Sequence, residues 1–306
     1  MIAFVLSGGG NRGALEVGAL LALFEHGIQP DILVGTSAGA MNATFIATDP
    51  SLAGAQRLAE LWLGVSGDQV YPGNILTMAW RFITGQDSFY PNDSLRRLAE
   101  MYMPPGFERF GDITAVKLYV TAANLNTSTL YLFGDDPTAP LIEAALASAA
   151  IPTIFPPIEY GGWQYVDGGV VATVPISIAV DKGATVIYAI NVGYSGQVRK
   201  PIKGIVNIGQ QTITTMIYQQ LLDDLEEIAA RPEIMLHHIQ ITAFQDIPGT
   251  DFSHTAEMIE EGKRVTEEYL AHPRQPGEPL RIARVIEPAP PPPGAVIWRR
   301  RRPEEA

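Results

Sequence analysis

Short apolar segments alternate with helical patterns along most of the chain. The segments typical of strands, rich in β-branched and aromatic residues, lie at residues 2–6, 31–34, 117–123, 128–133, 164–166, 184–190 and 234–242. The helical patterns lie at residues 14–26, 40–47, 141–150, 209–230 and 254–271. Strands that alternate with helices favour a mostly parallel sheet with helices on both faces. The pattern therefore predicts an α/β fold, with a mostly parallel central sheet flanked by helices.

One region, at about residues 51–111, interrupts this alternation. It carries few strand signals but several aromatic side chains, namely Trp62, Tyr71, Trp80, Phe82, Phe89 and Tyr90. We expect a helical insertion that caps the mouth of the functional site. The α/β domain is predicted to span residues 1–287, and the Pro- and Arg-rich residues 288–306 are expected to form a disordered, solvated tail.

Composition narrows the classes of partner. The 306-residue chain has a formal net charge of −12. This charge argues against nucleic acid as a partner, because a surface that binds phosphates needs clustered Lys and Arg. Disulfides, thiol catalysis and zinc–thiolate sites are excluded because no Cys is present, and no His, Asp or Glu cluster has metal-ligand spacing. No apolar run approaches the roughly 20 residues of a membrane span, and the start of the chain lacks the basic segment of a signal peptide. We expect a cytoplasmic protein that requires neither metal nor cofactor and binds no nucleic acid.

A candidate nucleophile follows the second predicted strand. Residues 35–39 form a G-x-S-x-G motif with Ser37 at its centre, flanked by Gly35 and Gly39. Because the motif joins a hydrophobic strand to a helix of small residues, it predicts a nucleophile elbow, a sharp turn that exposes the serine oxygen. The alternative is a serine that caps the helix that follows.

The loop after the first strand contains three consecutive glycines, Gly8, Gly9 and Gly10, followed by Asn11 and Arg12. Glycines at a helix start let backbone N–H groups approach an anion, so this loop is a candidate oxyanion hole. A phosphate-binding P-loop would need a Gly-Lys-Ser/Thr sequence, which is absent. A dinucleotide-binding loop would need an acidic residue at the end of the second strand, whereas the acid at that spacing lies before that strand.

Asp167 is the candidate general base. It ends a short predicted strand, and Gly168 and Gly169 follow it, so a tight turn can present its carboxylate. Taken alone, the same sequence is also typical of an ordinary turn. An imidazole base is less well supported, because none of the five histidines lies in a motif-like setting, and we expect each to be structural or exposed: His26, His237, His238, His254 and His272.

Together these segments resemble the patatin-like phospholipase family. Its signatures are a G-G-G-x-[KR]-G loop, a G-x-S-x-G elbow and a D-G-[GA] turn, found here in the family's order at residues 8–13, 35–39 and 167–169. Residues 147–157 are similar to the A-S-x-A-x-P block that precedes the aspartate. The resemblance ends at roughly residue 190 and implies a three-layer α/β/α fold. The insertion and the end of the chain match no motif of the family.

The resemblance also implies a mechanism. Asp167 would take the proton of Ser37 as the serine attacks an ester carbonyl, and water would then release the fatty acid from an acyl-enzyme. Gly8, Gly9 and Gly10, with Arg12, would form the oxyanion hole, although Arg12 could instead pair with a carboxylate that fixes its loop. A carboxylate is a weak base for a hydroxyl, so the surroundings of this dyad must be partly dry.

The expected function is a serine lipid acyl hydrolase acting on phospholipids, lysophospholipids or acyl esters. One alternative is an acyltransferase of the same fold that passes the acyl group to an alcohol or thiol. Related acyltransferases generally use a histidine, and the histidine context of this chain counts against that alternative. A non-enzymatic lipid-binding protein is a third alternative, disfavoured because all four motifs are retained.

A candidate for peripheral contact with a membrane or micelle lies inside the insertion. Residues 75–83 are mostly apolar and are bounded by Gly73 and Gly85. Such a segment either forms a mobile cap that touches lipid or packs on the body of the protein. A change in Trp80 fluorescence on mixing with micelles is expected only if the segment touches lipid.

Overall fold

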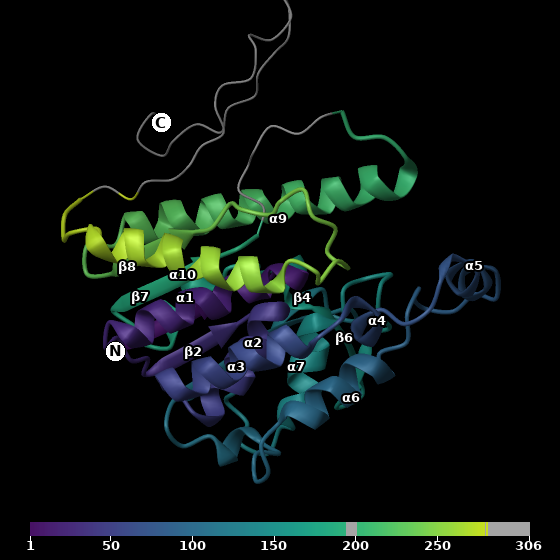
Figure 1. The fold of residues 1–306 in the computed structure, drawn as a ribbon, viewed down its shortest axis with the longest axis horizontal. Helices are drawn as coiled ribbons and strands as arrows, with labels where there is room; N and C mark the ends of the chain where they lie inside the picture. The colour runs from purple at the N-terminus through teal and green to yellow at the C-terminus, as the bar shows by residue number, and fades with distance from the viewer. Residues whose placement is uncertain (194–200, 279, 281–306) are drawn as a thin grey trace, which may run out of the picture.

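The computed structural model describes residues 1–193, 201–278 and 280; the predicted tail at residues 288–306 lies outside this range (Figure 1). Its strands are β1 (Ile2–Leu6), β2 (Ile32–Gly35), β3 (Lys117–Asn124), β4 (Thr129–Phe133), β5 (Ile158–Tyr160), β6 (Trp163–Asp167), β7 (Val186–Asn191) and β8 (Met235–Gln240). They form one eight-stranded sheet in the order β5-β6-β3-β2-β1-β7-β8, and β4 also pairs with β3. The strands β3, β2, β1, β7 and β8 pair parallel in that order. The strands β4 and β6 pair antiparallel with β3, and β5 pairs antiparallel with β6.

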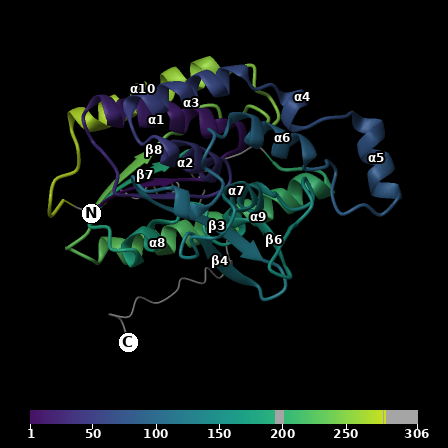
Figure 2. The same cartoon turned by 90° about the horizontal axis from the view of Figure 1, so that it is seen from below.

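Helices cover both faces of this sheet. The α-helices of the described residues are α1 (Gly13–Glu25), α2 (Ala38–Thr48), α3 (Leu52–Gly64), α4 (Gly67–Val70), α5 (Ile75–Ile83), α6 (Asp93–Tyr102), α7 (Leu141–Ala149), α8 (Ile176–Asp181), α9 (Ile205–Ala229) and α10 (Thr255–Ala271). Figure 2 shows α1, α3 and α10 on one side of the sheet and α8 and α9 on the other. Each side has its own buried apolar cluster. The predicted fold class, a mostly parallel sheet flanked by helices, is confirmed.

The segment predicted as a helical insertion contains α3, α4, α5 and α6, which follow α2 and precede β3. Helix α3 packs against α1 and contributes Leu58 and Trp62 to the larger apolar cluster. Helix α5 stands away from the body of the molecule in both views (Figures 1 and 2). The insertion thus has one part built into the core and one part that projects from it.

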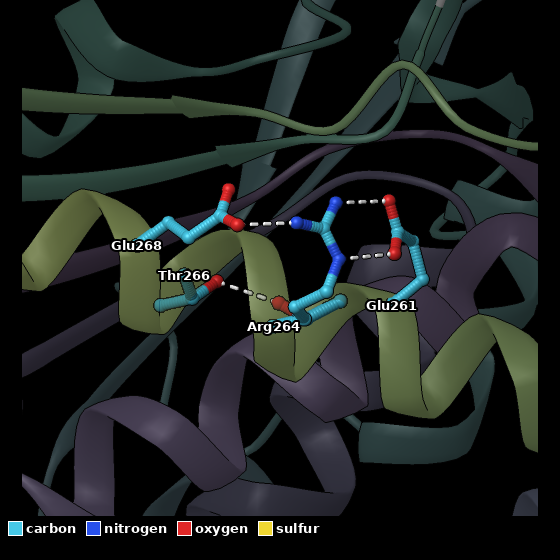
Figure 3. Close-up of polar contacts among 5 residues, drawn as sticks. Glu261, Arg264, Thr266 and Glu268 are labelled. Carbon is cyan, nitrogen blue, oxygen red and sulfur yellow. Dashed lines mark hydrogen bonds and ion pairs between the residues drawn. The ribbon is translucent and has the colours of Figure 1, made fainter.

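The last helix closes one face of the domain by packing tightly on α1. A Cβ atom on Gly262 would lie only 1.9 Å from the carbonyl oxygen of Leu15, so the two helices approach at backbone distance. On the outer side of α10, Arg264 pairs with Glu261 and Glu268, whereas buried Thr266 donates a hydrogen bond to the carbonyl of Gly262 (Figure 3). This packing holds α1, and with it the glycine loop at its start.

Several element ends are shifted by one or two residues from the expected ranges, and three elements differ further from the sequence pattern. The pattern missed β5 and α8, since three and six residues are too few to show a period. Helix α9 begins at Ile205 and not at Gly209, with Gly204 as its N-cap residue at a φ of 90°. None of these three differences moves the strand ends that carry the candidate site.

Candidate active site

The register of three neighbouring strands brings the candidate nucleophile and base together. Gly35 pairs with Val120 in the parallel β2–β3 ladder, and Asp167 pairs with Ala122 in the antiparallel β3–β6 ladder. Ser37 is two residues beyond Gly35, and Ala122 is two residues beyond Val120. Ser37 and Asp167 therefore lie at the same level on the two sides of β3. Ser37 Oγ donates a hydrogen bond to Asp167 Oδ2 at 2.6 Å.

Ser37 occupies a strained turn between β2 and α2. Its backbone has φ 55° and ψ −122°, a conformation that is unfavourable for a residue with a side chain and that is retained where the surroundings enforce it. A Cβ atom on Gly35 would lie 2.5 Å from the carbonyl oxygen of Gly39, and one on Gly39 would lie 2.5 Å from that of Leu6. Ser37 is the N-cap residue of α2, but its side chain makes no capping hydrogen bond, so the alternative in which this side chain caps the helix is wrong.

The Ser148 hydroxyl fixes the elbow from a second direction. Its Oγ accepts a hydrogen bond from the amide of Ser37 at 2.8 Å. The amide of Asp167 donates to the carbonyl of Ala150 at 2.9 Å, just after α7 ends. The block at residues 147–157 therefore contacts both the serine elbow and the aspartate turn, a role that sequence reasoning did not assign to it.

Asp167 is buried, with 6% of its surface exposed. Its Oδ1 accepts a hydrogen bond from the amide of Gly169 at 2.7 Å, and its Oδ2 accepts the hydroxyl of Ser37. Burial raises the pKa of Asp167 to about 6, because the cost of desolvating the charge exceeds the stabilisation from these two bonds. Gly168 packs against Thr121 of β3. The carboxylate is therefore a stronger base than an exposed aspartate, and its turn is fixed.

The glycine loop requires one correction. The amide of Gly8 donates to the carbonyl of Thr173 at 3.0 Å, so Gly8 is not available as an oxyanion donor, contrary to the sequence prediction. Within the described part of the chain, the amides of Gly9 and Gly10 have no backbone acceptor outside the short helix that begins at Gly10. Gly10 has a φ of 61° and lines the same cavity as Ser37. Two of the three predicted amides remain available for an oxyanion.

Arg12 contacts the backbone beyond β7. Its Nε donates to the carbonyl of Val192 at 3.1 Å, which ties the end of the loop to that strand. The side chain of Asn11 donates to the carbonyls of Pro248 and Asp251, and Gln245 donates to the carbonyl of Gly193. The connection between β8 and α10 therefore covers the glycine loop. Sequence reasoning missed this contact because the connection carries no motif.

An apolar cavity opens at Ser37 and Gly10. It encloses about 950 Å³ of space not filled by atoms, part of it open to solvent. Side chains of α2, α3, α6 and α7 form most of its wall, among them Met41, Phe45, Leu58, Trp62, Leu95 and Ile142. Phe252, from the connection before α10, stacks on Trp62 at a ring-centroid distance of 6.1 Å. The insertion thus supplies a wall of the cavity as well as the projecting α5.

Three of the five histidines have hydrogen-bond partners away from Ser37. His26 Nδ1 contacts the carbonyl of Ala22, His237 contacts the hydroxyl of Tyr269, and His238 contacts the side chain of Asn191. Burial lowers the pKa of both His237 and His238 to about 4. In the described residues no histidine forms a hydrogen bond with the elbow serine, whose hydroxyl donates to a carboxylate.

Metal-ligand clusters and long apolar helices are both absent from the described ranges. No group of three or more His, Cys, Asp or Glu side chains there is arranged to hold a metal ion. No helix in the same ranges has the length and apolar character needed to cross a membrane.

The mixed sheet carries a serine elbow, a buried carboxylate and a glycine loop at the ends of its strands, an arrangement typical of α/β enzymes with a serine nucleophile. The chain belongs to the patatin-like phospholipase family, whose model matches residues 4–180. This membership confirms the resemblance found in the motifs. The cavity-lining Phe252 and the connection over the glycine loop lie beyond the matched range.

Relatives with curated names include both short and long proteins. The chain is 30% identical over 290 residues to "Uncharacterized protein YqhO" of Bacillus subtilis, a match that covers 87% of this chain and 97% of that protein. It is 28% identical over 200 residues to "Lysophospholipase NTE1" of Scheffersomyces stipitis, which covers 63% of this chain but only 12% of that protein. Among solved structures, VipD from Legionella pneumophila has a TM-score of 0.47 at 15% identity, covering 88% of this chain and 66% of that one.

Proposed function

We propose that the protein is a serine lipid acyl hydrolase in which Ser37 is the nucleophile and Asp167 the general base. The observation that carries this proposal is the 2.6 Å hydrogen bond between the two side chains, on a buried pair that opens into an apolar cavity. A strained serine with an adjacent base is the arrangement that activates a hydroxyl for acyl transfer.

The proposed reaction uses these groups in the following order. Asp167 takes the hydroxyl proton as Ser37 Oγ attacks the ester carbonyl, and the amides of Gly9 and Gly10 stabilise the oxyanion that forms. The protonated Asp167 then gives its proton to the leaving alcohol or lysolipid, which leaves an acyl-enzyme. Water, deprotonated by Asp167, attacks the acyl carbonyl, and the fatty acid departs as the proton returns to Ser37.

The cavity favours an acyl chain as the part of the substrate that binds beside the serine. Its wall is almost entirely apolar, and burial of each CH₂ group there contributes about 0.8 kcal/mol. The family is named for phospholipases, and one relative that matches part of this chain is named a lysophospholipase. Both names support phospholipids and lysophospholipids as the substrate class. The substrate is therefore proposed to be a lipid ester with one chain in this cavity.

The test is product analysis with lysophosphatidylcholine, phosphatidylcholine and p-nitrophenyl butyrate, each with and without a primary alcohol as acceptor. We expect free fatty acid as the product in every case, with at most a minor ester of the added alcohol. A dominant new ester would instead identify an acyltransferase. No release from any of the three compounds would contradict the proposed reaction.

The rate is expected to depend on pH through Asp167. The base must be ionised, and its pKa is raised to about 6, so activity is present above that pH and lost as the pH falls through it. Below pH 6, kcat/KM should fall about tenfold for each pH unit. Hydrolysis of p-nitrophenyl butyrate across the acid range, with circular dichroism to verify folding, measures this limb. A limb near pH 4, typical of an exposed aspartate, would contradict the effect of burial.

We also propose that α5 makes peripheral contact with the surface of a lipid micelle or bilayer. Its outer side chains, Leu76, Trp80, Phe82 and Ile83, are 59–81% exposed, so the helix is not packed on the body through them. Exposed apolar groups of this size favour the interface between water and lipid. Tyr90 joins α5 to the cavity, since its hydroxyl contacts Met78 and its ring packs against Phe155.

Trp80 reports this contact directly. On mixing with phosphatidylcholine micelles, we expect the tryptophan emission to shift to shorter wavelength, because Trp80 leaves water. Trp80→Phe should remove most of the shift, whereas Trp163→Phe should retain it, since Trp163 is an exposed tryptophan on β6, outside α5. Loss of the shift in the Trp163 variant alone would show that the β5–β6 hairpin makes the contact instead.

A further inference from the structure

Glu16 is a buried acid that the proposed mechanism does not use. It lies in the first turns of α1 among apolar neighbours, and its exposed fraction is 0%. An isolated charge at such a position costs several kcal/mol, so a buried carboxyl is retained only with hydrogen-bond partners. Its partners therefore indicate what it does.

The two carboxyl oxygens of Glu16 face two different parts of the site. Oε1 accepts a hydrogen bond from the hydroxyl of Ser7 at 3.3 Å, and Oε2 accepts one from Nδ2 of Asn42 at 2.9 Å. Ser7 immediately precedes the glycine loop. The Oδ1 of Asn42 accepts the indole N–H of Trp62 at 2.8 Å, and Trp62 lines the apolar cavity. Glu16 thus joins the glycine loop to the cavity wall.

Ser7 is the point at which three segments of the site meet. Its Oγ accepts the amide of Val192 at 2.9 Å, and its carbonyl accepts the amide of Gly39 at 3.2 Å. Val192 in turn accepts the hydrogen bond of Arg12 at the far end of the loop. The contact of Glu16 with Ser7 therefore acts on the glycine loop, the serine elbow and the strand end together.

Burial raises the pKa of Glu16 well above its ordinary value, because desolvation exceeds the effect of its hydrogen bonds. Burial thus favours the neutral acid over the carboxylate, and in the neutral form the hydrogen bond between Oε1 and Ser7 Oγ is kept with the acid as donor, while Oε2 still accepts from Asn42. A glutamine has nearly the same shape as the neutral acid, and it can likewise donate to Ser7 Oγ from its nitrogen and accept from Asn42 with its oxygen, although it carries one donor hydrogen more. A leucine has a similar volume but can make neither contact.

We propose that Glu16 is a positioning residue that fixes the amides of Gly9 and Gly10 relative to Ser37, acting through Ser7 and Asn42. This inference rests on the proposed hydrolase function, because it assigns those amides to the oxyanion. Oxyanion donors contribute mainly in the transition state, so misplacing them lowers kcat and leaves KM nearly unchanged.

The experiment compares Glu16→Leu and Glu16→Gln with the wild type on p-nitrophenyl butyrate. For the leucine variant we expect kcat to fall about tenfold or more with KM within about twofold, and for the glutamine variant kcat within about threefold of wild type. Thr266→Val is the matched control, since it removes another fully buried hydrogen bond in the α1–α10 layer without contacting the loop. Its kcat should equal that of the wild type.

Two further measurements separate positioning from general destabilisation. Hydrogen exchange of the peptide covering residues 7–13 should be faster in Glu16→Leu and unchanged in Thr266→Val. Ser7→Ala should reproduce the loss of kcat, and the double variant should lose little more, because both act on one contact. The Ser7→Ala variant tests the inference even if Glu16→Leu does not fold.

The outcomes are distinct. Unchanged kcat in Glu16→Leu, additive losses in the double variant, or an equal loss in Thr266→Val would each overturn the inference. An inactive wild type would instead refute the proposed hydrolase function, and hydrogen exchange would then still decide whether Glu16 fixes the loop.

Discussion

Asp167→Asn is expected to lower kcat for ester hydrolysis by about 10³-fold while the fold remains intact. The amide oxygen of asparagine can still accept the hydrogen bond from Gly169, so the turn after β6 is retained. Its nitrogen, however, can only donate to Ser37 Oγ and cannot take a proton from it. The variant thus removes the proposed base with little change of geometry. Steady-state kinetics with p-nitrophenyl butyrate and thermal unfolding measure the two effects.

The chain offers a matched control for this change. Asp224 also accepts a hydrogen bond from a serine distant in sequence, Ser177 Oγ, at 3.1 Å, and burial likewise raises its pKa. This second pair joins α8 to α9, and neither residue lines the apolar cavity. We expect Asp224→Asn to retain wild-type kcat. Activity of Asp167→Asn within tenfold of wild type would show that another group serves as the base.

The large-scale fold was predictable because its strands and helices are long enough to show their periods. The strand at residues 2–6 is a run of apolar residues that the sheet buries, and the glycines after it mark the loop. The positions of Ser37 and Asp167 followed from short motifs at strand ends. Their contact depends on β3 lying between β2 and β6, a strand order that no local pattern encodes.

What the sequence did not predict depends on tertiary contacts. The amide of Gly8 is occupied because Thr173, far along the chain, presents its carbonyl to it. The connection over the glycine loop has no period and no motif, so its contacts with Asn11 could not be inferred. Glu16 did leave a signal: it is a charged residue within a helix that is otherwise apolar on most sides. Such a residue needs buried partners, and finding them identifies a structural network.

Ser37→Ala is expected to abolish turnover, with kcat lowered by at least about 10⁴-fold, because the proposed acyl-enzyme cannot form without the hydroxyl. Alanine tolerates the positive φ of the elbow no better than serine does, so the strain in this turn is unchanged. A fluorophosphonate probe should label the wild type once and leave Ser37→Ala unlabelled, as read by intact-protein mass spectrometry.

Ser177→Ala is the control that makes this result specific. Ser177 donates to a carboxylate, as Ser37 does, but it lies within the regular helix α8 and does not line the cavity. A hydrogen bond to an aspartate alone does not activate a serine: the strained turn, the free amides of the glycine loop and the dry surroundings must act with it. The Ser177 variant should therefore be labelled and hydrolyse esters like the wild type. Labelling that persists in Ser37→Ala and disappears in Ser177→Ala would place the nucleophile on α8 and refute the assigned site.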